Sequence, residues 1–220
     1  MLSKIYSFLH RLFVKPQERG EYSGGYWQDL VRRETLILCR PLSGRLLEVG
    51  CGEGLFLTQL ARQNQHLEFW GVDNNPLRLK EAEKHFQENN LCKISLSLQE
   101  AAGLNFADEY FDAVICINVI FNLESRDSAK KVLEEAARVC KKNGKLVLDF
   151  RNSANPLMRI KYKLAPFYDQ TVKHLPLKVY SLAELRLILE ETGFVITGKI
   201  YTGFPIKSIA PIIILEAEKI

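Results

Sequence analysis

The sequence predicts an α/β fold in which helices cover both faces of a doubly wound, seven-stranded, mostly parallel sheet. Two observations lead to this prediction. Apolar runs of strand length alternate with segments of helical periodicity along the chain, a pattern typical of parallel sheets. The last two apolar runs are joined by a short link with Gly203 and Pro205, which leaves no room for a crossover helix. We therefore expect the last two strands to pair antiparallel, as a C-terminal hairpin.

Each expected element has a local signal. The expected strands are apolar runs at 45–49, 67–72, 93–98, 111–117, 145–150, 195–201 and 210–216. The expected helices carry apolar residues at helical spacing and cover 25–39, 54–62, 76–89, 125–140 and 181–192. Pro76 is a favoured first-turn residue, and Ser181 with Glu184 has the spacing of a capping box. The fourth helix opens at Asp127 and is expected to stop at 141–144, where two lysines precede an asparagine and a glycine.

The length and composition of the chain fit one α/β domain with additional segments. The chain has 220 residues, of which 47% are hydrophobic and 25% charged, so a normal core can form. We expect a helical lid segment over 1–42 and the domain proper over 43–220. The net charge of +4 is too small to indicate a nucleic-acid partner. The five cysteines are odd in number and contain no C-x-x-C pair, so neither a disulfide framework nor a metal site is expected.

The first fifteen residues have an amphipathic pattern with two interpretations. Apolar residues fall on one helical face, and basic residues lie around the rest; the apolar ones are Leu2, Ile5, Leu9 and Leu12. A helix that packs on the domain as part of a lid is preferred to a basic helix that rests on an anionic membrane surface. Charges interrupt the segment and no small-residue cleavage site follows, so a secretory signal is not expected. No apolar run is long enough to span a bilayer. The expected location is the cytoplasm, with the inner face of the membrane as a contact under the second interpretation.

The most informative motif is a glycine-rich turn between the first strand and the first helix of the domain. Residues 46–54 read L-L-E-V-G-C-G-E-G, with glycines at 50, 52 and 54. Glycine lets a backbone turn tightly and lets a ligand approach without a Cβ in the way. The next strand ends on Asp73, whose carboxylate can accept hydrogen bonds from both hydroxyls of a ribose. This layout predicts a nucleoside-cofactor site beyond the carboxyl ends of the strands.

The glycine spacing argues against a dinucleotide. The dinucleotide fingerprint is G-x-G-x-x-G, whereas this turn reads G-x-G-x-G and is preceded by Glu48. A carboxylate there would repel a pyrophosphate but suits a ligand with an ammonium and a sulfonium group. A nicotinamide-dependent oxidoreductase is therefore not favoured.

Residues 48–54 resemble the first motif of the class I S-adenosylmethionine (SAM) methyltransferases, and residues 71–73 resemble the second. The resemblance covers about 46–216 and implies the family's fold, with SAM as cofactor. It implies that the glycine loop holds the methionine part and that Asp73 binds the ribose, with a helix N-cap as the alternative role. Residues 98–106 resemble the third motif, which implies that Glu100 binds the adenine, with a solvated loop carboxylate as the alternative. The residues expected at the cofactor are Glu48, Gly50, Cys51, Gly52, Gly54, Asp73, Asn74, Glu100, Ala101 and Asn118.

The segment after the fourth strand, 117–123, faces the transferred methyl group in the family that this chain resembles. Many small-molecule relatives have a histidine near position 122, but this chain has Asn122, whose amide cannot act as a general base. The difference indicates a catalyst that works by proximity, or a base elsewhere. Tyr168 and His174 are the candidates for that base, and packing is the alternative role for each. No catalytic residue is assigned beyond the candidates Asn122, Tyr168 and His174.

The stretch 151–180 is the least regular part of the sequence and is strongly basic. Six lysines and arginines accompany a single acid, Asp169. The functional interpretation is a substrate lid that favours an anionic or lipid-linked acceptor, and the alternative is a solvated basic helix. Nucleic acid is not favoured, because no N-P-P-Y-like tetrad follows the fourth strand. The residues expected at the acceptor are Tyr22, Tyr26, Asn122, Arg151 and Tyr168.

The predicted function is a SAM-dependent methyl transfer to a small-molecule or lipid-linked acceptor. The alternative is a SAM-binding module without turnover, such as a partner subunit. This alternative remains because Asn122 stands where many relatives have a histidine. The sequence indicates neither the acceptor atom nor the oligomeric state.

Overall fold

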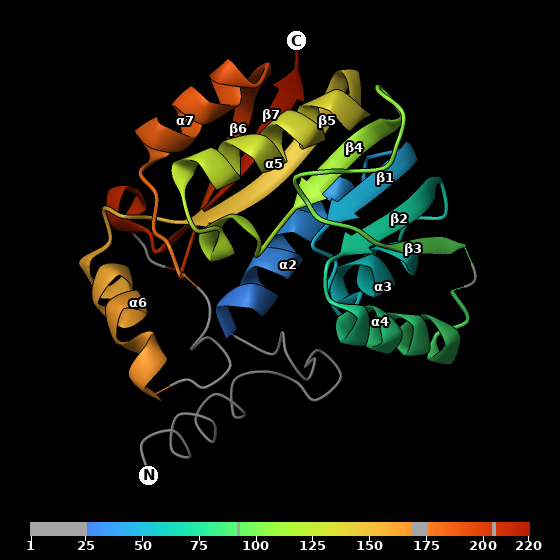
Figure 1. The fold of residues 1–220 in the computed structure, drawn as a ribbon, viewed down its shortest axis with the longest axis horizontal. Coiled ribbons are helices and arrows are strands. Elements are labelled where there is room, and N and C mark those ends of the chain that lie inside the picture. The colour runs from blue at the N-terminus through green and yellow to red at the C-terminus, as the bar shows by residue number, and fades with distance from the viewer. Residues whose placement is uncertain (1–25, 92, 169–175, 204–205) are drawn as a thin grey trace.

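Seven strands form one sheet within the residues described by the computed structural model, which are 26–91, 93–168, 176–203 and 206–220, without the side chains of 165–168. The strand order is β3-β2-β1-β4-β5-β7-β6 (Figure 1). The first five strands are parallel: β1 (Gly44–Val49), β2 (Leu67–Asp73), β3 (Ile94–Leu98), β4 (Phe111–Cys116) and β5 (Cys140–Arg151). The last two are β6 (Phe194–Thr202) and β7 (Ile212–Lys219); β7 pairs antiparallel with both β5 and β6. The predicted fold class and its antiparallel C-terminal hairpin are confirmed.

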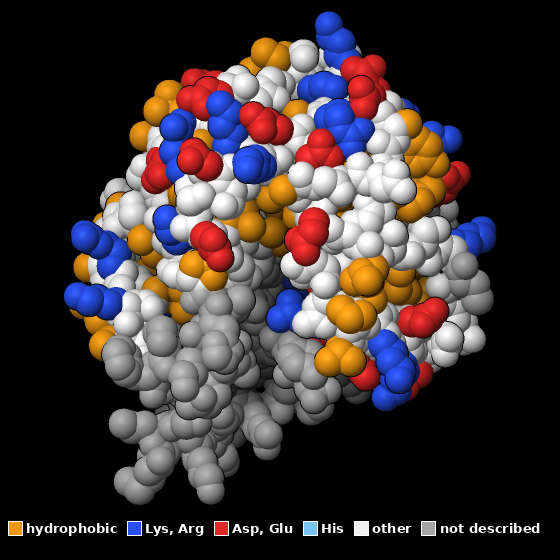
Figure 2. All heavy atoms as spheres, in the orientation of Figure 1, with side chains coloured by type: hydrophobic (Ala, Val, Ile, Leu, Met, Phe, Trp, Pro, Cys, Tyr) orange, Lys and Arg blue, Asp and Glu red, His pale blue; other side chains and the backbone are white. Residues whose placement is uncertain are grey.

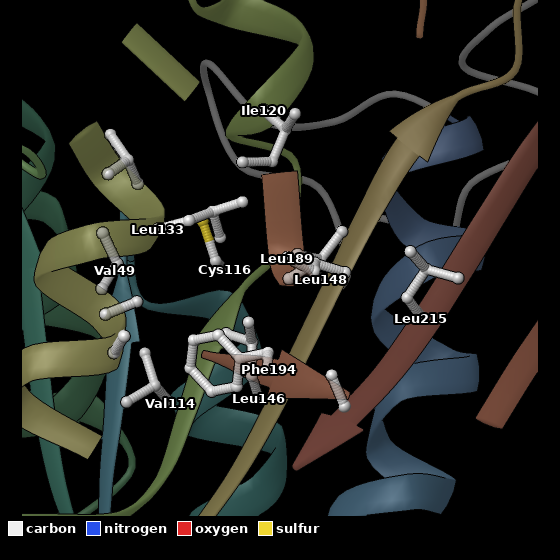
Figure 3. Packing of buried hydrophobic residues seen from close by; sticks show 14 of the residues in the cluster. Val49, Val114, Cys116, Ile120, Leu133, Leu146, Leu148, Leu189, Phe194 and Leu215 are labelled. Atoms are coloured by element: carbon white, nitrogen blue, oxygen red, sulfur yellow. The ribbon is translucent and has the colours of Figure 1, made fainter. Parts of the chain in front are cut away.

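Helices pack on both faces of this sheet (Figure 1). One face carries α5 (Arg126–Val139) and α7 (Leu182–Glu191), and the other carries α2 (Tyr26–Cys39), α3 (Leu55–Ala61) and α4 (Pro76–Glu88). Successive strand residues alternate between the faces, so Leu146 and Leu148 of β5 belong to the first core cluster and Val147 to the second. Figure 3 shows the first cluster, in which strand residues pack against Leu133 of α5 and Leu189 of α7.

The predicted helix starts are confirmed where the capping signals are local. Asn75 caps α4, because its side chain accepts the N–H group of Leu77 at 3.0 Å, and Pro76 follows in the first turn. Ser181 and Glu184 form both hydrogen bonds of the capping box at the start of α7. The cap of α5 is Ser125.

The end of α5 lies within one residue of the expected Cys140, but β5 begins at Cys140 rather than at the expected residue 145. The helix ends at Val139, and the chain enters β5 directly at Cys140, which pairs with Phe111 of β4. Lys141 does not face a helix C-terminus, since its ammonium bonds the Asp112 carboxylate at 2.6 Å. Asn143 adopts a left-handed φ of 61° beside a register shift between β4 and β5. Pairing with β4 therefore begins directly at the end of the helix and takes in residues 141–144.

The stretch 151–180 is more regular than expected. It contains α6 (Pro156–Tyr168), which begins where Asn155 accepts the N–H group of Met158 at 2.8 Å. Asn152 and Tyr180 form a parallel bridge that returns the chain to the end of β5. The segment 156–168 is thus a basic helix, and its role as a substrate lid stays a prediction. No helix of the described ranges is long and apolar enough to cross a membrane.

Candidate cofactor and acceptor site

The glycine loop follows β1 at the centre of the sheet, between β2 and β4. The N–H groups of Gly50 and Cys51 donate to the carbonyl of Val72 at 2.8 and 2.9 Å, which ties the loop to β2. All three motif glycines are left-handed, with φ values of 74°, 53° and 69° in order. A Cβ on Gly50 would also collide with the side chain of Val119. The loop therefore requires glycine both for its turn and for its close approach to the segment after β4.

Asp73 holds this loop in place from the end of β2. Its Oδ2 accepts the N–H group of Gly52 at 2.9 Å, and its Oδ1 accepts that of Asn75 at 2.9 Å. The alternative that Asp73 caps α4 is wrong, because Asn75 is the capping residue. Each carboxylate oxygen can accept a second hydrogen bond, so Asp73 retains acceptor capacity for ribose hydroxyls.

Glu48 is a buried carboxylate two residues before the loop. Its side chain is 3% exposed, and Oε2 has no hydrogen-bond partner among the described residues. Burial holds the pKa of Glu48 well above its usual range; Arg32 of α2 opposes the rise, and Asp73 adds to it. A buried acceptor without a donor costs free energy, which an incoming ammonium group would recover. This unpaired oxygen beside a cradle that excludes Cβ atoms fits the amino end of SAM.

Cys51 lies inside the loop as a neutral thiol. It is 6% exposed, and burial raises the pKa of Cys51 well above its usual range. It therefore packs as a small apolar residue. Among the described residues, no group of His, Cys, Asp and Glu side chains is arranged to hold a metal ion.

The ends of β2 and β3 bring the expected adenine-side residues together. Asn74 donates through Nδ2 to the two carboxylate oxygens of Glu100, at 3.2 and 3.4 Å. Gln99 donates its N–H group to the carbonyl of Asp73 at 3.1 Å, which holds the two strand ends side by side. Ala101 is partly buried against the core. Contact of these residues with adenine stays a prediction.

The segment after β4 is built around Asn118, which has a left-handed φ of 59°. Its N–H group donates to Asp149 of β5, and its carbonyl accepts Nδ2 of Asn122 at 3.0 Å. Its own Nδ2 lies 3.5 Å from the carbonyl of Gln28 in α2. Oδ1 of Asn122 is buried and has no hydrogen-bond partner in the described ranges. Asn118 and Asn122 thus form one polar unit at the carboxyl end of β4.

A buried cation fixes that unit from β5. Arg151 is 1% exposed, pairs with Asp149, and donates to Oδ1 of Asn118 at 3.0 Å. Its Nε donates to the Tyr162 hydroxyl of α6 at 2.7 Å, and its guanidinium lies 4.1 Å from the ring centroid of Phe121. We call Asn118, Phe121, Asp149, Arg151 and Tyr162 the Arg151 cluster. Burial raises the pKa of Asp149, and Arg151 opposes the rise.

This geometry revises the expectation for Arg151. Its guanidinium is buried and engaged by four protein partners, so a direct contact with an anionic acceptor is not what its surroundings favour. The sequence prediction missed Asp149, although two residues at spacing i, i+2 on one strand share a face. Tyr162 was missed because its partner lies on another element.

The other expected acceptor residues are only partly described. Tyr26 is 43% exposed at the start of α2, with its ring edge-on to Trp27. Tyr22, His174 and the side chain of Tyr168 lie outside the described residues.

Comparisons with known proteins agree with this geometry. The model of a methyltransferase domain matches residues 46–144. The chain is 31% identical to a phosphatidylethanolamine N-methyltransferase of Cereibacter sphaeroides over 150 residues, which is 67% of this chain and 71% of that protein. It is 35% identical to a ubiquinone/menaquinone biosynthesis C-methyltransferase of Chromobacterium violaceum over 178 residues, 79% of this chain and 68% of the relative.

Solved structures share the fold. A magnesium protoporphyrin IX methyltransferase of Synechocystis PCC 6803 with bound SAH superposes with a TM-score of 0.71 at 19% identity, covering 99% of this chain and 95% of the other. A protein of Pyrococcus horikoshii OT3 gives a TM-score of 0.70 at 19% identity, with 97% and 98% covered. The sequence relatives, together with the glycine loop and the strand order, establish that the chain belongs to the class I SAM-dependent methyltransferases, enzymes whose cofactor is S-adenosyl-L-methionine.

Proposed function

We propose that the protein transfers a methyl group from SAM to a lipid-linked or other small acceptor, with anionic acceptors favoured. The observation that carries this proposal is the pair of helices around the carboxyl end of β4. Asn118 contacts α2 through the carbonyl of Gln28 and α6 through Arg151 and Tyr162. α6 contains basic residues and no acid. The two sequence relatives named above are, by their names, a methyltransferase of phosphatidylethanolamine and one of ubiquinone and menaquinone biosynthesis, which supports a lipid-linked acceptor.

The cofactor side is assigned by the chemistry of its groups. We propose that the glycine loop and Glu48 hold the methionine end and that Asp73 binds the ribose. We further propose that Asn74, Glu100 and the backbone of Ala101 contact the adenine. The unpaired Oε2 of Glu48 supports the first assignment. The hydrogen bonds that join Asn74 to Glu100 support the third.

Bound SAM supplies an electrophilic methyl group on a sulfonium, whose in-line transfer needs alignment and exclusion of water. The residues of this chain at the carboxyl end of β4 match that requirement. Asn118 and Asn122 carry amides, which orient partners and take no proton near neutral pH. Arg151 is proposed as a positioning residue that keeps Asn118 and α6 in a fixed relation. An acceptor that must lose a proton needs a base, and Tyr168 and His174 remain the candidates.

The remaining assignments concern the protein's surroundings. We propose a cytoplasmic protein in which residues 1–15 form part of the lid, the interpretation preferred from the sequence. Contact of this segment with the inner face of the membrane is the competing assignment, which its apolar face with basic residues around it also fits. Nucleic acid is not proposed as a partner.

The test is transfer of tritium from methyl-labelled SAM to a panel of acceptors. The panel holds phosphatidylethanolamine, prenylated quinols, anionic small molecules, total RNA and a mixed protein extract. Label that partitions with the lipid or small-molecule acceptors is the expected result, and the Asp73→Ala variant provides the background. Label found only in RNA or protein would contradict the proposal.

A further inference from the structure

The outer face of α6 is apolar and open. Leu157, Ile160 and Leu164 are 68%, 56% and 49% exposed, although each is a large aliphatic side chain. Their spacing of three and four residues places them on one side of the helix. The described residues thus leave an aliphatic stripe without protein cover along two turns.

The same helix is cationic. Arg159 and Lys163 are exposed and stand one turn apart between the aliphatic positions. The sequence of α6, P-L-M-R-I-K-Y-K-L-A-P-F-Y, contains no acid. Figure 2 shows basic side chains interspersed with hydrophobic ones on the side where Figure 1 places α6. An exposed aliphatic stripe among cations complements a surface that is apolar within and negatively charged at its face.

The inner face of α6 is anchored. Met158 is 2% exposed, and the Tyr162 hydroxyl accepts a hydrogen bond from Arg151 at 2.7 Å. The Lys161 ammonium lies 5.8 Å from the ring centroid of Trp27 in α2. These contacts hold the helix in one orientation, so its outer face is presented outward in a fixed direction.

We propose that the outer face of α6, formed by Leu157, Arg159, Ile160, Lys163 and Leu164, docks on an anionic phospholipid surface. The inference deepens the proposed function and rests on it, since a lipid-linked acceptor resides in a membrane; it assigns the membrane contact to α6, a described element, rather than to residues 1–15. Docking through α6 sets the Arg151 cluster, and with it the acceptor side of the site, next to the lipid. A lipid-linked acceptor would then reach the site without leaving the membrane.

The experiment measures co-sedimentation of the full-length protein with vesicles of phosphatidylcholine that contain 30–40 mol% phosphatidylglycerol (about one anionic lipid in three), against pure phosphatidylcholine. Ile160→Glu/Leu164→Glu removes the stripe, and binding should fall at least tenfold. Arg159→Gln/Lys163→Gln removes two charges, and binding should fall about thirtyfold at low salt. Binding to phosphatidylcholine alone should be weak.

The chain offers matched controls. Ile37→Glu changes an aliphatic residue of α2 that is 56% exposed, as is Ile160. Lys80→Gln/Lys84→Gln removes two exposed cations one turn apart on α4. Both controls should bind vesicles as the wild type does. All variants should keep the affinity for S-adenosylhomocysteine, which shows that they are folded.

Several outcomes would overturn the inference. One is wild-type vesicle binding in the α6 variants, with loss in Ile5→Glu/Leu9→Glu, because residues 1–15 would then make the contact alone. Another is an α6 variant that changes the sedimentation coefficient but not vesicle binding, because the face would then bind a second copy. Equal binding to neutral vesicles would also contradict it. Methyl transfer to a detergent-dispersed acceptor tests the proposed function separately, and it should survive in the α6 variants whichever result the vesicles give.

Discussion

Arg151→Met removes the charge of the Arg151 cluster and leaves a side chain of similar length. Asp149 is 0% exposed, so in the variant its carboxylate stays buried without a counter-charge. The change also deletes the hydrogen bonds to Tyr162 at 2.7 Å and to Asn118 at 3.0 Å. Breaking a buried ion pair by removing one partner costs about 3–5 kcal/mol. For a chain of this size each kcal/mol corresponds to about 2–4 °C, so the midpoint should fall by about 10 °C.

The loss depends on pH in a defined direction. Burial raises the pKa of Asp149 and Arg151 opposes that rise, so in the variant the pKa of Asp149 should rise further. A raised folded-state pKa means that the folded protein holds a proton that the unfolded chain releases above its ordinary value of about 3.9. Stability is then fully present below that value and falls as pH rises through the folded-state pKa. The deficit of the variant should therefore grow from about pH 4 toward pH 7.

Urea unfolding at pH 4.5 and pH 7, followed by circular dichroism, measures the loss of unfolding free energy and its pH dependence, and a thermal scan at pH 7 measures the shift of the midpoint. Arg126→Met is the matched control, because Arg126 pairs with Glu191 at 2.9 Å where both side chains are over 40% exposed. It should cost about 1 kcal/mol or less. Asp149→Asn/Arg151→Met should recover part of the loss, since no charge stays buried. A deficit for Arg151→Met no larger than the control's would refute the reasoning.

Three further predictions concern the site. The affinity for S-adenosylhomocysteine should rise as pH rises through the elevated pKa of Glu48, because the ammonium group favours the ionised carboxylate; calorimetry in two buffers should detect proton release, and Glu48→Gln should abolish it. Gly50→Ala should lower that affinity at least tenfold, because φ is 74° and the Cβ has no room, whereas Gly103→Ala, with no atom within 4 Å of its Cβ, should not. Wild-type affinity for S-adenosylhomocysteine in a folded Gly50→Ala protein would exclude the glycine loop as the cofactor site. Tyr162→Phe should slow methyl transfer and leave S-adenosylhomocysteine affinity unchanged, and equal losses in both would assign it a purely structural role.

The helix starts and the glycine turn could be predicted from sequence, because they depend on residues only a few positions away in the chain. Asn75 with Pro76, and Ser181 with Glu184, satisfy the first N–H groups of their helices from within a few residues, so these starts can be derived from sequence. The glycine spacing at 50–54 likewise matches three left-handed residues. Such features need no knowledge of the rest of the fold.

Features that depend on distant partners were not predictable in this way. The strand after α5 was expected to begin at residue 145, but Cys140 pairs with Phe111 and Lys141 with Asp112, both on β4, so β5 begins at Cys140. Arg151 was expected at the acceptor because it is cationic and follows a strand, yet Tyr162 and Asn118 enclose it from two other segments. The sequence alone does not show whether a charged side chain will be buried and paired with another residue of the fold.

The central claim is that the glycine loop and Asp73 bind the cofactor, and calorimetric titration with S-adenosylhomocysteine tests it most directly. Asp73→Ala removes the proposed acceptor for the ribose and also the carboxylate to which the N–H group of Gly52 donates at 2.9 Å. One charge-assisted hydrogen bond contributes about 1.5–3 kcal/mol, so affinity should fall at least about tenfold. Asp112→Ala is the control, because this carboxylate bonds Arg45 and Lys141 at the opposite end of the strands; it should lower stability and leave affinity unchanged. A folded Asp73→Ala protein with wild-type affinity would contradict the assignment.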